Sequence, residues 1–415
     1  MEEWKEYKLG EIFDFNNGLS KRGKFFGHGY DFVSFKTVFK NHFLPNTLDD
    51  LVESSKKERE KFSVKEGDVF LTRTSETQNE LAYSCVALKD YPNATYNGFT
   101  KRLRPNGKIK IDSIFSAYFF RSAIFRNQVT SMSNMVTRAS LSNEMLDRMS
   151  IKIPSYDLQK TIGKILFSFD AKIQLNKRIN DNLEQQAQAL FKAWFVDFEP
   201  FKDGKFVESE LGMIPEGCRV GKAEDFYNIN IGKTPPRKEQ IWFSSNSSDY
   251  TWVSISDLGS CGRFVFTSSE FLTHEAIKRH NIILVPKDTI LLSFKFTIGR
   301  VGIAGTELTT NEAIARFITS DENREYTYFL LKGYNYEKLG STSSIATAVN
   351  SKIIKAMVVL MPDKEILKAF SSLTKPYFDQ ILRNEQESIR LTILRDTLLP
   401  KLMSGELKIN ATEVL

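Results

Sequence analysis

Residues 153–195 read IPSYDLQKTIGKILFSFDAKIQLNKRINDNLEQQAQALFKAWF. After Pro154, apolar residues recur at intervals of three and four, which is the spacing of one stripe along a helix. The positions between them are mostly Lys, Gln, Asn, Asp and Glu. Pro154 suits a helix entrance and Pro200 suits an exit. The pattern therefore predicts a helix of about 40 residues, or about 60 Å in length.

A helix with so narrow an apolar stripe is not stable alone and needs a long partner. A shift of 208 residues supplies one, because Pro154 then aligns with Pro362 and Asn176 with Asn384. The two apolar stripes are Leu158, Ile162, Ile165, Phe169, Ile173, Leu183 and Leu190 in the first helix and Ile366, Phe370, Leu373, Tyr377, Ile381, Leu391 and Leu398 in the second. A buried Asn at such a position fixes the register of a coiled coil. The alternative is a pair of exposed Asn residues that interrupt the stripe.

Each expected helix follows a block of similar composition, in which short Phe-, Val- and Ile-rich segments alternate with Gly, Asn, Asp and Ser turns. Both blocks end in a polar loop, a short helix and an apolar strand stopped by Pro, in TRASLSNEMLDRMSIKIP and STSSIATAVNSKIIKAMVVLMP. The chain thus repeats itself. We expect an α+β fold in which two α/β domains of irregular mixed sheet are each followed by a long helix.

The expected boundaries follow from this repeat. They are 1–154 for the first domain, 155–199 for the first spacer helix, 200–362 for a linker and the second domain, and 363–415 for the second spacer helix and the C-terminal tail. Two such units in one chain can close about a pseudo-twofold axis. The two helices would then form an antiparallel coiled coil with one domain near each end.

An aromatic excess marks the end of the first helix, in LFKAWFVDFEPFKDGKF at residues 190–206. Core packing is the default explanation for such a cluster. Because Pro200 stops the helix and a glycine follows it, we expect Trp194, Phe195 and Phe198 to fix the second domain against the coiled coil.

Composition bounds the class of protein. The chain of 415 residues has a net charge of +6, with 41% hydrophobic and 26% charged residues. No run approaches the roughly 20 apolar residues of a membrane span, and the N-terminal MEEWKEYKLG does not resemble a secretory signal. We expect a soluble, cytoplasmic protein. Residues 1–154 contribute +5, 200–362 contribute +1, and the two helical stretches contribute 0, which is compatible with a polyanionic partner.

Enzyme signatures are missing from the sequence. Cys85, Cys218 and Cys261 are too few and too scattered for a disulfide framework, and no Cys or His pair has the spacing of a zinc site. The GKT at 232–234 lacks the glycine of a phosphate loop five positions before its Lys, and two prolines follow it. We expect a chain without catalytic residues or a metal site, which binds rather than reacts.

Polar and basic residues crowd corresponding loops of the two blocks. Arg, Lys, Asn and Gln are the side chains that contact base edges in the major groove, and Ser and Thr contact phosphates. The candidates are Lys21, Arg22, Lys24, Arg73, Thr74, Gln78, Asn97, Lys101, Arg102, Lys233, Thr234, Arg237, Lys238, Lys295, Arg300, Asn311 and Arg316. For each one alone, a solvated surface charge is the alternative. Their recurrence on matching loops favours DNA.

A family resemblance is carried by the long helix with its WFVDF end, by ESELGMIPEG at 208–217 and by LRDTLLPKLMSGELKI at 394–409. The whole chain resembles the specificity subunit of a type I restriction-modification system. The resemblance implies two target recognition domains, each recognising one half of a split sequence in double-stranded DNA. It implies that the helices set the spacing and dock two modification (methyltransferase) subunits, and that restriction subunits join the complex. S-adenosylmethionine, ATP and Mg would belong to those partners, with none bound by this chain, and no membrane is involved.

Three alternatives stay open at this point. The chain could be a structural coiled-coil scaffold without a nucleic-acid role. It could be a DNA-binding subunit of another modification or nuclease system. It could also be a nuclease or methyltransferase itself, against which the missing motifs argue.

Overall fold

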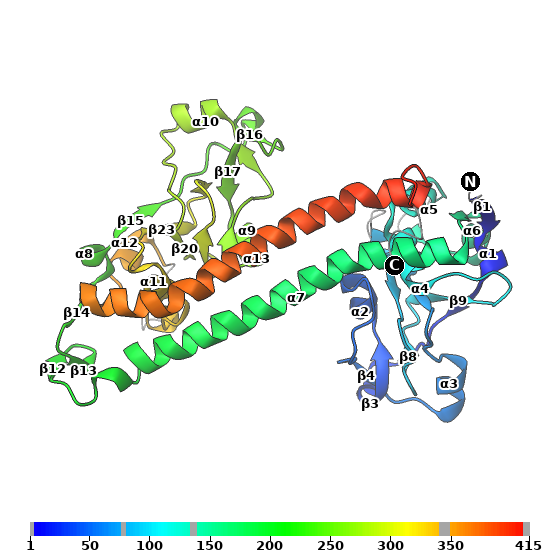
Figure 1. Cartoon of the computed structure of the whole chain (residues 1–415), viewed down its shortest axis with the longest axis horizontal. Helices are drawn as coiled ribbons and strands as arrows, with labels where there is room; N and C mark the ends of the chain where they lie inside the picture. The colour runs from blue at the N-terminus through cyan, green and yellow to red at the C-terminus, as the bar shows by residue number, and fades with distance from the viewer. Residues whose placement is uncertain (1–3, 76–79, 133–138, 340–348, 410–415) are drawn as a thin grey trace. The chain divides into compact units, whose positions relative to one another are not determined.

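The computed structural model describes residues 4–75, 80–132, 139–339 and 349–409 (Figure 1). The chain divides into two compact units: unit 1 is Met1–Ile173 with Arg390–Leu415, and unit 2 is Gln174–Ile389. Two long helices, α7 (Tyr156–Phe195) and α13 (Lys364–Ser404), each contribute one segment to both units. No helix among the described residues is long and apolar enough to cross a membrane.

Unit 1 is built on a four-stranded antiparallel sheet with the order β2-β9-β5-β7. A second sheet has the order β4-β3-β8, and β1–β11 and β6–β10 form two-stranded pairs. The strands are β1 (Lys5–Lys8), β2 (Phe13–Asn17), β3 (Phe26–Val33), β4 (Leu51–Val52), β5 (Val69–Thr72), β6 (Thr74–Ser75), β7 (Ser84–Val86), β8 (Thr95–Tyr96), β9 (Thr100–Pro105), β10 (Ala139–Ser140) and β11 (Ser150–Ile153). The short helices are α1 (Leu9–Ile12), η1 (Gly23–Phe25), α2 (Phe35–Lys40), α3 (Lys56–Lys61), α4 (Ser113–Arg121), α5 (Ala123–Met132) and α6 (Asn143–Arg148).

Unit 2 repeats this plan with a five-stranded sheet, β15-β23-β20-β21-β18, and a four-stranded sheet, β16-β19-β17-β22. The strands are β12 (Phe206–Ser209), β13 (Gly212–Pro215), β14 (Cys218–Lys222), β15 (Asn228–Ile231), β16 (Phe243–Ser244), β17 (Tyr250–Val253), β18 (Phe264–Val265), β19 (Phe271–Leu272), β20 (Ile290–Ser293), β21 (Val301–Ala304), β22 (Thr309–Thr310), β23 (Ile314–Ile318) and β24 (Val358–Pro362). The short helices are η3 (Glu199–Phe201), α8 (Ala223–Phe226), η4 (Gln240–Trp242), α9 (Ile255–Ser260), α10 (His274–Arg279), α11 (Arg324–Lys332), η5 (Tyr336–Leu339) and α12 (Ser351–Lys355).

The duplication predicted from the sequence is confirmed by strand pairing. The antiparallel pair β1–β11 corresponds to β14–β24, and the parallel pair β3–β8 corresponds to β17–β22. The predicted short helix and apolar strand before each long helix are α6 with β11 and α12 with β24. Side-chain caps start these helices, since Ser142 Oγ accepts the Met145 N–H at 3.1 Å and Asn350 Oδ1 accepts the Ile353 N–H at 3.1 Å.

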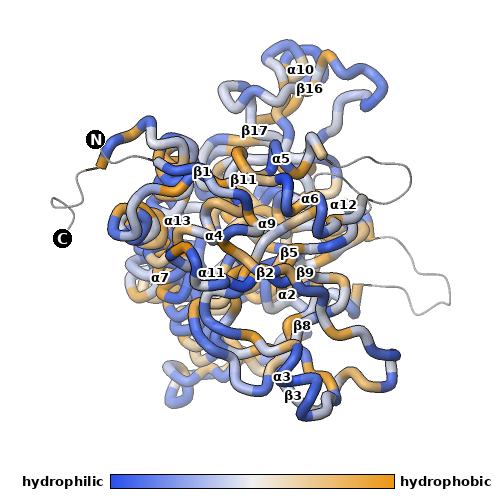
Figure 2. Tube along the Cα trace, turned by 90° about the vertical axis from the view of Figure 1, so that its right-hand side faces the viewer, coloured by the Kyte–Doolittle hydropathy of each residue, from blue (hydrophilic) through white to orange (hydrophobic). Residues whose placement is uncertain are grey.

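The apolar stripes of the long helices join the domain cores. In unit 1, Leu158 and Ile162 of α7 and Leu402 of α13 belong to the same buried cluster as the strands of the main sheet. In unit 2, Phe370 and Ile381 of α13 belong to the corresponding cluster. Each helix segment therefore buries apolar surface against its own domain as well as against the other helix. By contrast, α3, with the sequence KKEREK, has no buried residue and is hydrophilic in Figure 2.

Asparagines in the middle of the helix pair are buried, as predicted for register-fixing residues. Asn176 is 0% exposed and Asn384 is 5% exposed. Asn176 Nδ2 donates to Asn384 O at 3.3 Å and to Ser388 Oγ at 3.2 Å, and Asn384 Nδ2 donates to Asn180 Oδ1 at 2.8 Å. Asn176 and Asn384 stand 208 positions apart, as do Asn180 and Ser388. The contacts within unit 2 are thus repeated about a local twofold axis, and the helix segments are antiparallel there.

Other stripe residues contribute unequally to the packing. Leu158, Ile162, Phe370 and Ile381 are buried, while Ile165, Phe169, Ile173, Leu183, Leu190, Ile366, Tyr377, Leu391 and Leu398 are partly buried. The expectation for Leu373 is wrong, because this side chain is 46% exposed. Its neighbour Thr374 and, one turn on, Phe378 are both 0% exposed. A helix that packs against both a domain and a second helix buries a broader face than a helix in a two-stranded coiled coil. The buried positions therefore depart from the strict spacing of the coiled-coil stripe.

The aromatic junction at the end of α7 packs within unit 2 as predicted. Phe195 lies 4.8 Å from Tyr326 and 5.0 Å from Phe370 between ring centroids, and Trp194 lies 5.9 Å from Phe370. Phe198 adopts a left-handed conformation with φ 53° and packs against Phe206. Because this residue breaks the helical geometry, α7 ends at Phe195, four residues before the predicted boundary at 199.

Candidate nucleic-acid interface

In both units a glycine packs directly on an asparagine turn. A Cβ at Gly18 would clash with the carbonyl of Asn97, and a Cβ at Gly232 would clash with the carbonyl of Asn311. The following residues bind the same turns, since Leu19 N donates to Tyr96 O at 2.7 Å and Lys233 N donates to Thr310 O at 2.9 Å. Each glycine therefore allows a polar loop to pack against the turn that leads into a sheet strand, which is β9 in unit 1 and β23 in unit 2.

A third segment joins each of these contacts. Arg73 N donates to Phe99 O at 2.8 Å in unit 1, and Phe294 N donates to Ala313 O at 3.0 Å in unit 2. We call residues 18–25, 73–75 and 97–100 the unit 1 loop cluster. Residues 232–238, 294–300 and 311–313 form the unit 2 loop cluster. The fold thus assembles the same three segments twice, although they are far apart in sequence.

The unit 1 loop cluster holds most of the predicted residues of its domain. Lys21 is partly buried in an ion pair with Glu58 at 2.9 Å, whereas Arg22 and Lys24 are exposed. Lys24 Nζ lies 5.0 Å from the centre of the Phe25 ring. Three further predicted residues, Arg73, Thr74 and Asn97, are partly exposed. Gln78 lies outside the described residues.

The unit 2 loop cluster also gathers cations, but several of them have protein partners. The Lys233 ammonium donates to the His280 carbonyl, and the Thr234 hydroxyl donates to Glu312. Arg237 makes a bidentate pair with Glu270 at 2.9 Å for both bonds and lies 4.6 Å from the Trp252 ring centre. Lys238 is exposed, and Lys295 is partly exposed.

Two other predicted residues hold loops in place. Arg300 Nη1 donates to Ile255 O at 2.7 Å, which fixes the guanidinium beside α9. Asn311 Oδ1 accepts the Ala313 N–H at 3.1 Å, and Asn97 Oδ1 accepts the Phe99 N–H at 2.7 Å. The two asparagines therefore shape equivalent turns at equivalent places.

Three of the predicted contact residues are buried, which corrects the expectation that they face DNA. Lys101, Arg102 and Arg316 are 3%, 5% and 1% exposed. Arg102 Nη1 donates to Ser63 O at 2.7 Å, and the Lys101 ammonium donates to Asn143. A charged side chain enters a domain interior when local acceptors replace water, and Ser63 and Asn143 provide such acceptors here.

Arg102 and Arg316 occupy equivalent places in the repeat. Arg102 stands opposite Asn16 in the β2–β9 register, and Arg316 stands opposite Asn230 in the β15–β23 register. Arg316 donates to Ile283 O at 2.9 Å and to Ile231 O at 2.8 Å, and burial lowers the pKa of this guanidinium to about 10. Both arginines link their strand to a loop that precedes it in the chain, through the carbonyl of Ser63 in unit 1 and of Ile283 in unit 2.

Metal and thiol chemistry find no support in the described part of the chain. No group of three or more His, Cys, Asp or Glu there could hold a metal ion. Burial raises the pKa of the Cys85 thiol to about 12 and those of Cys218 and Cys261 to about 11. Such thiols stay protonated at neutral pH and are poor nucleophiles.

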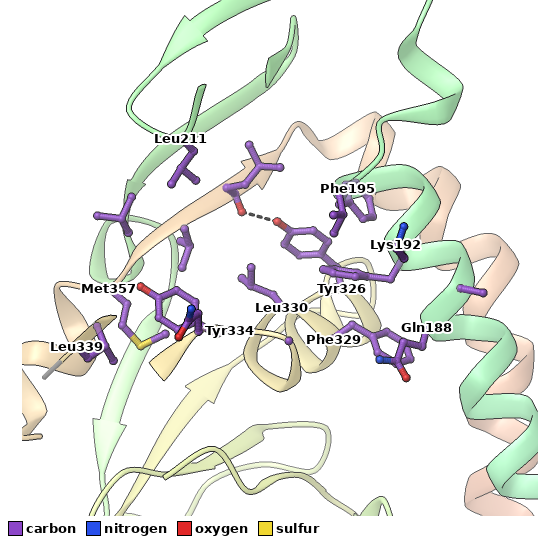
Figure 3. A pocket seen from close by; sticks show the side chains of 18 of the residues that line it. Gln188, Lys192, Phe195, Leu211, Tyr326, Phe329, Leu330, Tyr334, Leu339 and Met357 are labelled. Carbon is purple, nitrogen blue, oxygen red and sulfur yellow. Dashed lines mark hydrogen bonds between the residues drawn. The ribbon is translucent and has the colours of Figure 1, made fainter. Parts of the chain in front are cut away.

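A cavity of about 960 Å³ forms a second candidate site in unit 2 (Figure 3). Its lining is mainly apolar and aromatic and comes from α7, α11, β24 and the segment before β13. Phe191, Phe195, Val196, Leu211, Tyr326, Phe329, Leu330, Tyr334, Leu339 and Met357 line it. The Tyr326 hydroxyl donates to the Leu360 carbonyl at its wall. Lys192 is the charged residue of this lining, and the other lining residues are apolar, aromatic or uncharged and polar.

The model of the type I restriction modification DNA specificity domain matches residues 1–185 and 215–391, that is, both repeats. The chain belongs to this family. The MjaIX specificity subunit of Methanocaldococcus jannaschii, a type I restriction enzyme subunit, is 30% identical over 78% of this chain and 75% of its own. The HindI specificity subunit of Haemophilus influenzae is 25% identical over 98% of this chain and 100% of its own.

A solved structure of a specificity subunit shares the fold. The type I S subunit of M. genitalium has a TM-score of 0.56 at 13% identity, with 97% of this chain and 96% of that chain covered. The chain is thus a type I specificity subunit, whose function is recognition of a DNA sequence, and its two repeated domains fit a bipartite target.

Two features escaped prediction from the sequence. Phe99 and Phe296 are exposed by 63% and 99% within the loop clusters. Aromatic residues in Phe-rich segments are most simply assigned to a core, and only the positions of Gly98 and Gly299 beside tight turns could have signalled otherwise. The cavity likewise depends on segments that meet only in the folded chain.

Proposed function

We propose that each loop cluster contacts one half of the bipartite DNA target. The observation that supports this most is the repeated glycine–asparagine contact, Gly18 with Asn97 and Gly232 with Asn311, beneath loops rich in exposed cations. Arg22 and Lys24 would contact the duplex in one half-site, and Lys233 and Lys238 would do so in the other. Lys and Arg near phosphates provide affinity, while polar side chains at base edges provide specificity.

The long helices would set the distance between half-sites and bind the partner subunits. Helices are suited to this because each residue adds a fixed rise of about 1.5 Å. We propose two modification subunits as partners, one for each repeat, with restriction subunits joining the complex. S-adenosylmethionine, ATP and Mg would be bound by those partners, and this chain would contribute no catalytic group. The apolar cavity beside α7 is a suitable surface for a modification subunit.

Reconstitution of methyl transfer tests whether the catalytic activity belongs to the modification subunits. We expect the purified chain to transfer no methyl group from tritiated S-adenosylmethionine to DNA from a strain without this system, and to enable transfer once modification subunits are added. Val196 lines the cavity and is 58% exposed, so Val196→Glu should weaken assembly without unfolding the chain. Val207→Glu, at a valine that is 43% exposed and lies outside the cavity lining, is the matched control. Methyl transfer by the chain alone would overturn the proposal.

A further inference from the structure

Phe296 stands out among the apolar side chains of unit 2. It is 99% exposed, in the loop between β20 and β21. Its backbone has a φ of 58°, in the left-handed region that favours glycine. Full exposure of a large apolar ring and a left-handed conformation at a non-glycine residue are both unfavourable for folding. Their coincidence at one residue points to a role other than stability.

The loop that presents Phe296 is tightly anchored. Ser293 N donates to Arg300 O at 2.9 Å, so the loop is closed at its base. The Ser293 hydroxyl donates to Thr297 O at 2.6 Å and accepts the Arg300 N–H at 3.0 Å. Gly299 N also donates to Ser293 O at 3.0 Å. These bonds hold the loop backbone in one conformation with the ring in solvent, which reduces the entropy lost on binding.

Unit 1 presents its own exposed aromatic ring, but from a different loop. Phe99 is 63% exposed at the tip of the turn at 97–100, where Thr100 N donates to Asn97 O at 2.9 Å. The residue of unit 2 that occupies the corresponding position is Ala313, which is 3% exposed. Each loop cluster therefore displays one aromatic ring that is more than half exposed, from a different segment in each unit. Domains that recognise different half-sites would differ in this way.

We propose that Phe296 and Phe99 act as wedges, each inserting its ring between adjacent base pairs of one half-site. The inference rests on the proposed function of the loop clusters. Apolar side chains inserted at a base step unstack it and kink the duplex, and nearby cations hold the phosphates. Lys295 directly precedes Phe296 in its loop, and the Phe99 carbonyl accepts the Arg73 N–H. Stacking against the bases would bury each ring, which is exposed to solvent in the free protein.

Fluorescence of 2-aminopurine tests the wedges. The full chain, assembled with its modification subunits, would be titrated with duplexes that carry the sequence methylated by this system in its host. In each duplex one base would be replaced by 2-aminopurine, so that the series covers every base step of both half-sites. We expect one step in each half-site to brighten on binding. Phe296→Ala should abolish the signal in one half-site only and Phe99→Ala in the other, with affinity lowered about 10- to 100-fold in each case. Phe296→Trp should keep the signal.

Controls separate this result from a folding defect and from failure of the proposed function. Met213→Ala, at a 56% exposed apolar residue outside both loop clusters, should bind and brighten like wild type. Phe296→Ala should melt at the wild-type temperature. Unchanged affinity of Phe296→Ala would overturn the wedge, as would an affinity loss that vanishes when thymines of the half-site are replaced by uracils. If wild type itself does not prefer the target over a scrambled duplex, the proposed function fails instead.

Discussion

Buried arginines show why residue type alone did not identify the contact surface. Arg316 and Lys238 look alike in the sequence, yet Arg316 is 1% exposed whereas Lys238 is exposed. Burial of Arg316 depends on the register of β23 with β15 and on two carbonyls, one from Ile231 of β15 and one from Ile283 in the loop before β20. A shift of 214 residues aligns the buried Arg102 with Arg316, but it also aligns the exposed Lys24 with Lys238. Recurrence in the repeat therefore does not separate the buried cation from the exposed one, and the tertiary structure is needed to do so.

Replacing these residues should separate stability from binding. Arg316→Met leaves backbone carbonyls without their charged donor and should lower the free energy of unfolding by about 2–4 kcal/mol. Lys238→Met should leave stability unchanged, weaken DNA binding, and reduce the slope of log affinity against log salt by about one. Chemical denaturation and salt-dependent binding titrations check both variants. A stable Arg316→Met protein that has lost DNA binding would contradict the structural role.

At the scale of elements, the long helices were the most predictable part of the chain. Their spacing of apolar residues gave the helices themselves, and the repeat gave the antiparallel pairing. The boundaries were less predictable, because α7 ends at Phe195, before the left-handed Phe198, rather than at the expected boundary at 199. Leu373 was misplaced for a related reason, since contact with a domain widened the buried face beyond the coiled-coil seam. Such tertiary effects do not appear in a local sequence pattern.

The buried asparagines provide a prediction at this scale. Asn384→Ala removes the donor to Asn180 and the side chain beside Asn176, and should lower the free energy of unfolding by about 1–3 kcal/mol. The double variant Asn176→Leu with Asn384→Leu should lose less free energy of unfolding than the two single variants lose together, because both partners become apolar at once. Asn182→Ala, at an exposed position of α7, is the control. Additive effects in a denaturation cycle would contradict coupling between the two asparagines.

For the whole molecule, the repeat is the feature that connects sequence, fold and function. Two domains of equivalent topology each end in a long helix, and the family match spans both repeats. Duplicated loop clusters with different side chains are what recognition of two unlike half-sites requires. Separate recognition predicts that either domain can be exchanged without affecting the half-site of the other.

Methylome sequencing after such an exchange tests this central claim most directly. A host carrying the complete system would express either the wild-type chain or a chimera in which residues 215–362 come from a relative with a different target. We predict a methylated motif of two half-sites separated by unspecified bases, of which the chimera changes one and keeps the other. A single uninterrupted motif, or a chimera that alters both half-sites together, would contradict the account.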